Sequence, residues 1–202
     1  MLRDNLIFDL GAVLYEIDFS RTVTAFLALT QGASAEVIGA AVQGHPGWQE
    51  FERGNITAEA FRELVRRELK VEAPDSAIDT AWNALLVGPL AGRAEWLRKL
   101  ARKHRLVLLS NTNEIHYKKL RPECTELLGH FEHLFLSFEM GYRKPEPEIY
   151  RALLDQMGWR AEDCTFFDDS AANVEAACAL GIDGRWVEGK SGTGLLALLG
   201  EK

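Results

Sequence analysis

Four short apolar runs along the chain have the length and composition of buried β-strands. None of the four contains a charged residue, which is typical of strands that helices cover on both faces of a parallel sheet. The runs are Leu6–Phe8, Leu106–Leu109, Leu134–Leu136 and Thr165–Phe167, and a weaker fifth candidate is Arg185–Val187.

Apolar residues at helical spacing fill the segments between these runs. One repeat, from Trp96 to Ala101, precedes the second run. Another extends from Pro147, which suits a first helical turn, to Gly158, which suits a helix end. A third repeat follows the last run and ends at Gly181. Strands that alternate with helices predict an α/β fold with a Rossmann-like parallel-sheet core.

The segment from residue 18 to residue 87 has a different character. It contains no clear strand, and its apolar positions repeat at helical spacing after Ser20 and Thr57, which are both plausible N-caps. We therefore predict an inserted helical cap domain at 18–87 and a core formed by 1–17 and 88–202. The alternative is that these helices only extend the core.

Polar or charged residues follow each of the four runs, and the third run is followed by the segment to Lys144. Asp9 follows the first run, Ser110 and Asn111 follow the second, and Asp168 and Asp169 follow the fourth. In open parallel sheets, ligands bind beyond the carboxyl ends of the strands. We therefore expect one sheet to collect these side chains at one site.

With Lys144 and its neighbours, these residues form four ordered motifs. The motifs are Phe8–Leu14, Leu109–Asn113, Arg143–Glu146 and Phe167–Asn173. Their order resembles that of the haloacid-dehalogenase-like superfamily, and the resemblance covers essentially the whole chain. It implies a magnesium-dependent hydrolase, with a phosphatase as the expected class.

The residue types in these motifs can support phosphoryl transfer. The carboxylate of Asp9 can attack phosphorus and form an aspartyl-phosphate intermediate. A cation must separate this carboxylate from the phosphate dianion, and Mg²⁺ typically takes one or two carboxylates together with waters and phosphate. Asp9 and Asp169 supply two carboxylates, and the resemblance implies that the backbone carbonyl of Gly11 is a third ligand.

The resemblance also implies roles for the other motif residues. Ser110 and Asn111 are expected to hydrogen-bond the transferred phosphoryl group. Lys144 is expected to pair with both the nucleophile and the phosphate. Asp168 and Asn173 are expected to orient the lysine and the metal ligands. For Asn173, hydrogen bonding at the strand end or the helix cap is an equal alternative.

Gly11 stands where most phosphatases of the family carry a second Asp, which protonates the leaving oxygen and then activates water. Such acid–base help is worth about 10²–10⁴-fold in rate. Another acid can replace it, with Glu16, Asp18 and His45 as candidates, or the leaving group can need less help. A third alternative is a non-catalytic binding or regulatory protein that keeps the metal site.

Within the superfamily, the chain is similar to bacterial sugar-phosphate phosphatases of the glucose-1-phosphate phosphatase type. The likeness includes Phe8–Gly11, Ile17–Phe19, Glu52–Gly54, Leu109–Asn113 and Phe166–Asp169. It implies a small phosphomonoester as substrate, with glucose 1-phosphate as a candidate. A 2-haloacid dehalogenase is a rival, which the paired acids of the last motif disfavour because that reaction has no phosphate to screen.

Composition and charge narrow the partners and the compartment. The formal net charge of −7 and the lack of a basic run disfavour nucleic acid as a partner. The sequence has neither a membrane-length apolar run nor a secretory signal, so we expect a cytoplasmic protein. Cys124, Cys164 and Cys178 form no CxxC pair and are expected to be reduced and packed in the core. The sequence indicates no oligomeric state.

Several other residues have less definite expectations. Four histidines lack zinc-binding spacing and are expected on the surface or in loops: His104, His116, His130 and His133. One set in the cap either contacts substrate or forms the cap's own core and a salt bridge: His45, Trp48, Phe51, Glu52 and Arg53. The tail from Gly189 to Gly194 lacks the lysine of a P-loop, so we expect a surface turn there.

Overall fold

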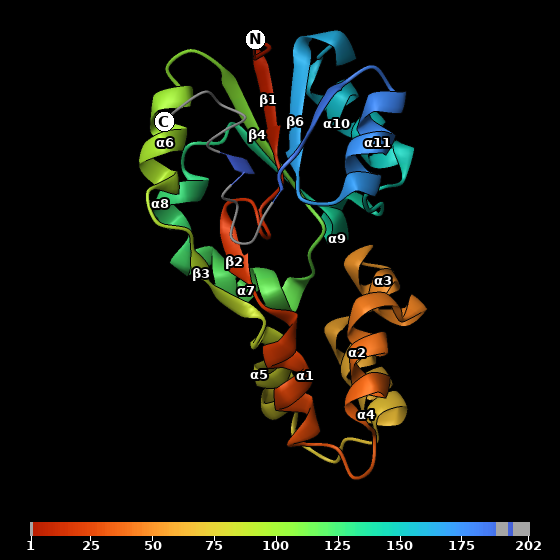
Figure 1. The fold of residues 1–202 in the computed structure, drawn as a ribbon. Coiled ribbons are helices and arrows are strands. Elements are labelled where there is room, and N and C mark those ends of the chain that lie inside the picture. Colours follow the sequence, from red (N-terminus) through yellow and green to blue (C-terminus); the bar gives the residue numbers. More distant parts are fainter. Residues whose placement is uncertain (1, 189–193, 196–202) are drawn as a thin grey trace.

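The computed structural model of the chain describes residues 2–188, 194 and 195. At its centre lies a five-stranded parallel sheet with the strand order β5-β4-β1-β6-β7 (Figure 1). The strands are β1 (Asn5–Phe8), β4 (Arg105–Ser110), β5 (His133–Leu136), β6 (Cys164–Asp168) and β7 (Asp183–Trp186). All five predicted strands are confirmed, although β7 ends one residue before Val187.

Alternate residues of the central strands point to opposite faces of the sheet, and each face has its own apolar core. Leu6 and Phe8 of β1 pack on one face with α6, α7 and α8, whereas Ile7 packs on the other face with α10 and α11. Helices on both faces explain why the strands are continuously apolar, and they confirm the predicted α/β class. The helices are α6 (Arg93–Leu100), α7 (Glu114–Glu123), α8 (Thr125–Leu128), α10 (Pro147–Met157) and α11 (Ala171–Ala179).

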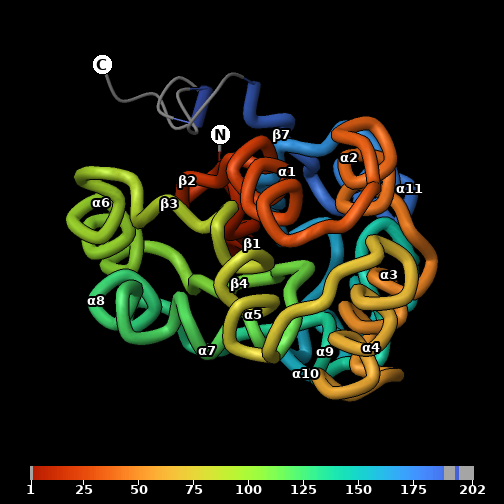
Figure 2. The backbone as a smooth tube through the Cα atoms, turned by 90° about the horizontal axis from the view of Figure 1, so that it is seen from below, coloured from red at the N-terminus to blue at the C-terminus, as the bar shows by residue number. Residues whose placement is uncertain are grey.

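Five further helices form a second group with a core of its own. Their buried side chains, among them Phe26, Phe61 and Val65, pack mainly against one another. Figures 1 and 2 show this group beyond the carboxyl ends of the sheet strands, which is where a cap is expected. The exact cap boundaries at residues 18 and 87 stay a prediction. The helices are α1 (Phe19–Leu27), α2 (Ala35–Gly44), α3 (Pro46–Glu52), α4 (Ala58–Leu69) and α5 (Asp75–Asn83).

The N-caps of α1 and α4 test two sequence predictions. Thr57 caps α4 as predicted, because its hydroxyl accepts a hydrogen bond from the N–H of Ala60 at 3.2 Å. The prediction that Ser20 caps α1 is wrong. Asp18 caps this helix, and its Oδ1 accepts from the N–H of Ser20 at 3.0 Å. A carboxylate makes a charge-assisted bond to the free N–H groups of the first turn, which favours Asp18 over the serine hydroxyl.

A short antiparallel ribbon connects the two groups, and the sequence pattern did not reveal it. Its strands are β2 (Tyr15–Ile17) and β3 (Leu86–Pro89). These strands have only three and four residues, and β3 contains Gly88 and Pro89, which are residue types depleted in strands. The ribbon also spans the predicted cap boundary at residue 87.

Three further expectations concern the cysteines, membrane spanning and the tail. Cys124 and Cys164 are buried as expected, but Cys178 is exposed on α11, so the core prediction is wrong there. Within the described residues, no helix has both the length and the apolar character needed to cross a membrane. The expected tail turn falls largely on residues 189–193, which lie outside the described residues.

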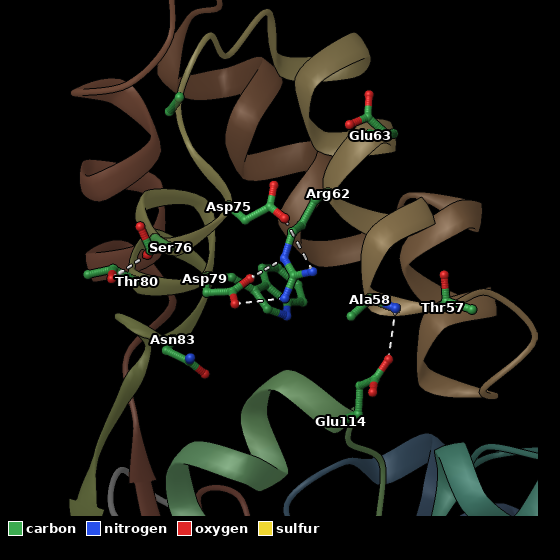
Figure 3. A network of polar contacts seen from close by, with 12 residues as sticks. Thr57, Ala58, Arg62, Glu63, Asp75, Ser76, Asp79, Thr80, Asn83 and Glu114 are labelled. Atoms are coloured by element: carbon green, nitrogen blue, oxygen red, sulfur yellow. Dashed lines mark hydrogen bonds and ion pairs between the residues drawn. The ribbon is translucent and has the colours of Figure 1, made fainter.

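Polar side chains connect the helical group to the core and strengthen the group itself. The N–H of Ala58, at the start of α4, donates to Oε1 of Glu114 on α7 at 2.7 Å (Figure 3). Just above this contact, Arg62 of α4 makes a bidentate pair with Asp79 of α5 at 2.8 and 2.9 Å. A helix N-terminus with a free N–H is a favourable partner for a carboxylate. Glu114 therefore joins α4 to the sheet-covering helix α7.

At Gly54, two residues after the end of α3, the backbone of the helical group comes close to the backbone of the core. Gly54 has a φ of +72°, and a Cβ at this position would collide with the carbonyl oxygen of Phe138 in α9 (Ser137–Met140). Any other residue must therefore both strain the backbone and push α3 away from α9.

We expect Gly54→Ala to lower the free energy of unfolding by about 2–4 kcal/mol, from the left-handed conformation and the steric collision together. Gly141→Ala is the matched control, because Gly141 has a φ of +78° but open space around it. The control should lose only about 1–2 kcal/mol. Urea unfolding measures both values, and equal losses in the two variants would contradict the close approach.

Candidate active site

The carboxyl ends of three neighbouring strands bring the predicted polar residues together. Asp9 directly follows β1, Ser110 is the last residue of β4, and Asp168 is the last residue of β6. The N–H of Asp9 donates to the carbonyl of Phe167 at 2.9 Å, which continues the β1–β6 pairing up to the site. The expectation that one sheet edge collects these side chains is confirmed.

Lys144 lies at the centre of the site and is almost fully buried, with 2% of its surface exposed. Its Nζ donates to Oδ1 of Asp9 and to Oδ2 of Asp168, both at 2.6 Å. Burial alone lowers the pKa of Lys144, but the carboxylates of Asp168 and Asp9 outweigh this effect and raise it. The ammonium is therefore charged, and its two partners compensate for the cost of burying it.

Asp168 is held from both of its carboxylate oxygens. Its Oδ2 accepts from Lys144, while its Oδ1 accepts from the N–H of Ser170 at 2.8 Å and from Nδ2 of Asn173 at 2.9 Å. Three hydrogen bonds hold this fully buried carboxylate in one orientation. Asp168 thus lies where it can orient the lysine, and Asn173 reaches the site through Asp168.

The side chain of Asn111 holds the backbone of Lys144. Its Nδ2 donates to the carbonyl of Lys144 at 2.9 Å, and its Oδ1 accepts from the N–H of Lys144 at 2.8 Å. This double contact connects the end of β4 to the loop that carries the lysine. The family resemblance implies that the Asn111 amide binds phosphate. In the structure its resolved contacts are with Lys144, and the phosphate contact stays a prediction.

Asp9 and Asp169 carry more negative charge than the lysine can balance. Burial raises the pKa of Asp9 to about 7 despite the nearby Lys144, and the neighbouring carboxylates of Asp168 and Asp169 raise it further. Burial and the charge of Asp168 also raise the pKa of Asp169. Three carboxylates around one ammonium leave an excess of negative charge that a bound cation would relieve.

The oxygen ligands fit a magnesium ion. Carboxylate oxygens of Asp9, Asp168 and Asp169 lie within 4.8 Å of one another. Asp168 is already committed to three hydrogen bonds, so Asp9 and Asp169 are the two carboxylates available to a metal. Three backbone hydrogen bonds flank Gly11, from Ala12 to the carbonyl of Tyr15 and from Leu14 and Tyr15 to the carbonyl of Leu10, and none of them uses the Gly11 carbonyl. A set of hard oxygen donors of this kind suits Mg²⁺.

A cavity of about 120 Å³ lies beside this cluster, between the sheet edge and the helical group. Ser110, Asn111 and Thr112 from the end of β4 line one part of it, and Gly11 lines another. A Cβ at Gly11 would stand 3.3 Å from Cδ1 of Ile17, so an apolar side chain borders the place where a larger residue would extend. Most of the remaining lining is apolar: Leu10, Tyr15, Ile17, Phe19, Val42, Trp82, Leu85, Leu86 and Leu120.

His116 lines this cavity, and its expected place on the surface or in a loop is wrong. It is buried in the first turn of α7, stacks on Trp82 at 4.8 Å, and its Nδ1 lies 2.9 Å from Oδ1 of Asn83. Burial lowers the pKa of His116 to about 3, so the ring is neutral at physiological pH. Its position just after the Ser110 motif was the available signal, because a helix that follows a sheet strand begins beside the ligand crevice.

Glu52 also lines the cavity, and the sequence left its role open between substrate contact and the cap's own core and salt bridge. It comes from α3 of the helical group and is the one carboxylate among the described residues that line the cavity. The three replacement acids considered from sequence do not line it. Asp18 caps α1, and Nδ1 of His45 accepts from the N–H of Gly47 at 3.1 Å as the cap of α3. Glu16 lies in β2.

Most of the set around His45 belongs to the core of the helical group. Trp48 and Phe51 are buried there and contact the ring of Phe61. Nε of Arg53 donates to Oε1 of Glu146 at 2.9 Å, so this arginine pairs with the loop that carries Lys144. Of the two readings left open from sequence, these contacts favour the cap core and the salt bridge.

Comparison with known proteins identifies the family. A family model described as a haloacid dehalogenase-like hydrolase matches residues 4–181. The chain belongs to this hydrolase family. The resemblance inferred from the four motifs is confirmed.

Named relatives of this hydrolase include phosphatases. It is 27% identical over 188 residues to a D-ribitol-5-phosphate phosphatase from Bacteroides thetaiotaomicron, with 89% of each chain covered. It is also 27% identical over 179 residues to a sesquiterpene phosphatase from Aspergillus oryzae, with 88% of this chain and 86% of the relative covered.

The fold of this hydrolase also matches that of a solved relative. A HAD family enzyme from Bacteroides thetaiotaomicron superposes with a TM-score of 0.87 and 31% identity, over 98% of this chain and 99% of that chain. A second structure of the same enzyme, in complex with magnesium and inorganic phosphate, has a TM-score of 0.81 and 33% identity over 93% and 95% of the two chains.

We expect Lys144→Met to lower the free energy of unfolding by about 3–5 kcal/mol in the presence of EDTA, because it leaves buried carboxylates without their cation. Lys119→Met is the matched control. Lys119 is 51% exposed and pairs with Glu123 on the surface, so its loss should cost at most about 1 kcal/mol. Urea unfolding at neutral pH compares the two variants. Equally small losses would show that the protein does not need the central ammonium.

Proposed function

We propose that the protein is a Mg²⁺-dependent phosphatase that hydrolyses a small phosphomonoester with Asp9 as the nucleophile. The observation that carries this proposal is the buried contact of Lys144 with both Asp9 and Asp168, beside the available carboxylate of Asp169. Phosphoryl transfer needs an in-line nucleophile and charge neutralisation more than any other help. The site supplies both at one edge of the sheet.

In this mechanism Asp9 attacks the substrate, and Lys144 and the metal ligands balance the negative charge. Lys144 holds Oδ1 of Asp9, and no hydrogen bond from the described residues reaches Oδ2. The Asp9 carboxylate attacks phosphorus, the bond to the leaving oxygen breaks, and an aspartyl phosphate forms. Water then cleaves this intermediate and restores Asp9. Mg²⁺, held by Asp9, Asp169 and the Gly11 carbonyl, would supply the charge that lets the two anions approach.

The phosphate itself would meet the end of β4 and the lysine. Ser110 lines the cavity beside Asp9, and Asn111 follows it. A hydroxyl and an amide at this place can donate hydrogen bonds to phosphoryl oxygens, and the Lys144 ammonium adds a positive charge. We assign phosphate binding to these three residues, with Asp168 and Asn173 orienting the lysine.

The cavity supports a small organic group, and we propose a sugar or polyol phosphate, with glucose 1-phosphate as one candidate. Its volume of about 120 Å³ is below the usual range for ligand pockets, which is roughly 300–1,000 Å³. Glu52, Thr112 and His116 offer polar contacts for hydroxyl groups, and Trp82 offers an aromatic face. One relative is named for a phosphorylated polyol, D-ribitol 5-phosphate.

A second candidate is a binding or regulatory protein without turnover, and one observation favours it. Gly11 provides no side chain for acid–base catalysis, and Ile17 borders that position. A pure binding protein, however, has no need of a buried nucleophile paired with a lysine. Measured turnover separates the two candidates.

We expect the protein to release phosphate from phosphomonoesters with Mg²⁺ and to lose this activity in EDTA. Asp9→Asn should lower turnover by at least about 10³-fold with unchanged folding, because an amide cannot serve as the nucleophile. Asp4→Asn, the same change at an exposed position before β1, is the control. A colorimetric phosphate assay over a substrate panel checks both. Retained activity in Asp9→Asn would refute the nucleophile assignment, and no release from any ester would favour the binding protein.

We expect Asp169→Asn to raise the Mg²⁺ concentration for half-maximal activity at least tenfold, because it removes one of two carboxylate ligands. Mg²⁺ should also raise the melting temperature of the wild-type protein and raise that of the variant less at equal concentration. Asp183→Asn, which removes an ion pair with Arg185, is the control and should keep the wild-type Mg²⁺ response. An unchanged response in Asp169→Asn would place the metal elsewhere.

A further inference from the structure

The missing acid at Gly11 leaves two proton transfers without an assigned residue. The leaving oxygen has to gain a proton, and the attacking water has to lose one. A group that performs both must share the cavity with the phosphoryl site. Among the described residues that line the cavity, three carry an ionisable side chain, namely Tyr15, Glu52 and His116.

Two of these three groups are unsuited to exchange protons near neutral pH. The Tyr15 hydroxyl donates to Oε2 of Glu123 at 2.7 Å, and burial raises the pKa of Tyr15. His116 has a pKa lowered to about 3 by burial, so the ring is not protonated near neutral pH. Glu52 is the group that remains.

One carboxylate oxygen of Glu52 is held in place and the other is free. Nε of Arg143 donates to Oε2 of Glu52 at 2.8 Å, and no hydrogen bond from the described residues reaches Oε1. Arg143 directly precedes Lys144, so this ion pair brings the carboxyl group from α3 to the lysine side of the site. About a quarter of the Glu52 side chain is exposed, which leaves a path for water.

A second ion pair supports the same placement. Arg53, the next residue along the chain, donates to Glu146 from Nε at 2.9 Å. The cap residues Glu52 and Arg53 thus pair with two core residues that flank Lys144, with opposite charge order. If α3 docked against this loop with the two partners exchanged, Glu52 would face Glu146 and Arg53 would face Arg143. Because like charges repel, the two ion pairs favour the observed register of α3 against the loop.

The electrostatic surroundings of Glu52 suit a carboxyl group that is protonated for part of the cycle. Burial raises its pKa, and this effect prevails over the opposing effects of Arg143, Arg53 and Lys144. A raised pKa brings a carboxyl group closer to the pH at which acid–base catalysis is efficient.

We propose that Glu52, delivered from the helical group, is the general acid and base that takes over from the residue missing at Gly11. The proposal rests on the phosphatase function proposed above. In the first half-reaction, Asp9 attacks phosphorus, the electron pair of the breaking P–O bond goes to the leaving oxygen, and the Glu52 carboxyl group gives it a proton. In the second, the Glu52 carboxylate takes a proton from water, whose oxygen attacks phosphorus. The bond to Asp9 breaks, and phosphate and a protonated Glu52 result.

Glu52→Gln tests this role through its dependence on the leaving group. Substrates with poor leaving groups, such as alkyl and sugar phosphates, need the proton, whereas 4-nitrophenyl phosphate does not. The variant should lose about 10²-fold or more in kcat/KM for alkyl phosphates but less than about tenfold for 4-nitrophenyl phosphate. The aspartyl phosphate should accumulate with 4-nitrophenyl phosphate, because its formation from this ester stays fast whereas its hydrolysis uses Glu52. Rapid quenching with labelled substrate measures this accumulation.

Arg53→Gln is the matched control, because it breaks the neighbouring ion pair with Glu146 and keeps the Glu52 carboxyl group. If Glu52 only helps to dock the helical group, both variants should lose activity by a factor that is the same for every leaving group. That result would overturn the proposal. A steeper leaving-group dependence in Glu52→Gln alone, with no accumulation of intermediate in Arg53→Gln, would support it.

The wild-type protein provides a test that needs no substitution. If Glu52 protonates the leaving oxygen, kcat/KM should depend only weakly on the pKa of the leaving alcohol. A steep dependence would overturn the proposal even if Glu52→Gln failed to fold. A wild-type protein that releases no phosphate with Mg²⁺ would refute the phosphatase function itself, and this proposal with it. An active wild-type protein with a fully active Glu52→Gln variant would refute only the role of Glu52.

Discussion

The contact of one buried ammonium with two carboxylates is the interaction on which the rest of the site depends. Asp9 and Asp168 end adjacent parallel strands, so the sheet itself forces two like charges together. Lys144, at 2.6 Å from each, converts this repulsion into attraction. A buried lysine is tolerable only with such partners. The strand ends and Lys144 therefore have to be placed correctly relative to one another. The remaining polar contacts of the site maintain this placement.

Those polar contacts act on position more than on charge. The side chain of Asn111 hydrogen-bonds both the N–H and the carbonyl of Lys144. The N–H of Ser170 and Nδ2 of Asn173 donate to Oδ1 of Asp168, the oxygen that does not contact Lys144. The Asn111 bonds join the end of β4 to the loop that carries Lys144, and the bonds to Asp168 join the end of β6 to the start of α11. The lysine is thereby held between β1, β4 and β6, and its charge cannot move away when Asp9 changes charge during catalysis.

The helical group completes the site from outside the sheet. It closes a small cavity over the strand ends and contributes Glu52 and Trp82 to its wall. It has its own apolar core, which Ile115 of α7 joins, and polar contacts and one tight backbone approach add to this attachment. Ion pairs such as Glu52–Arg143 and the N-terminal contact of α4 with Glu114 supply specificity of placement. Because the charged cluster lies on the sheet and part of the cavity lining lies on the helical group, lining residues of the helical group can be substituted without disturbing the cluster.

The sequence by itself determined the sheet, the family and the charged cluster. Apolar runs followed by Asp9, Ser110 and Asp168 suffice, because parallel strands align their carboxyl ends and so bring together residues that are far apart in the chain. Local patterns could not reveal the short β2–β3 ribbon, whose pairing is decided by the segments it connects. Only the tertiary structure decided that Glu52 and His116 face the cavity and that Asn111 holds Lys144. Helical spacing shows that a side chain is buried, whereas its neighbours depend on how separate helices dock against the sheet.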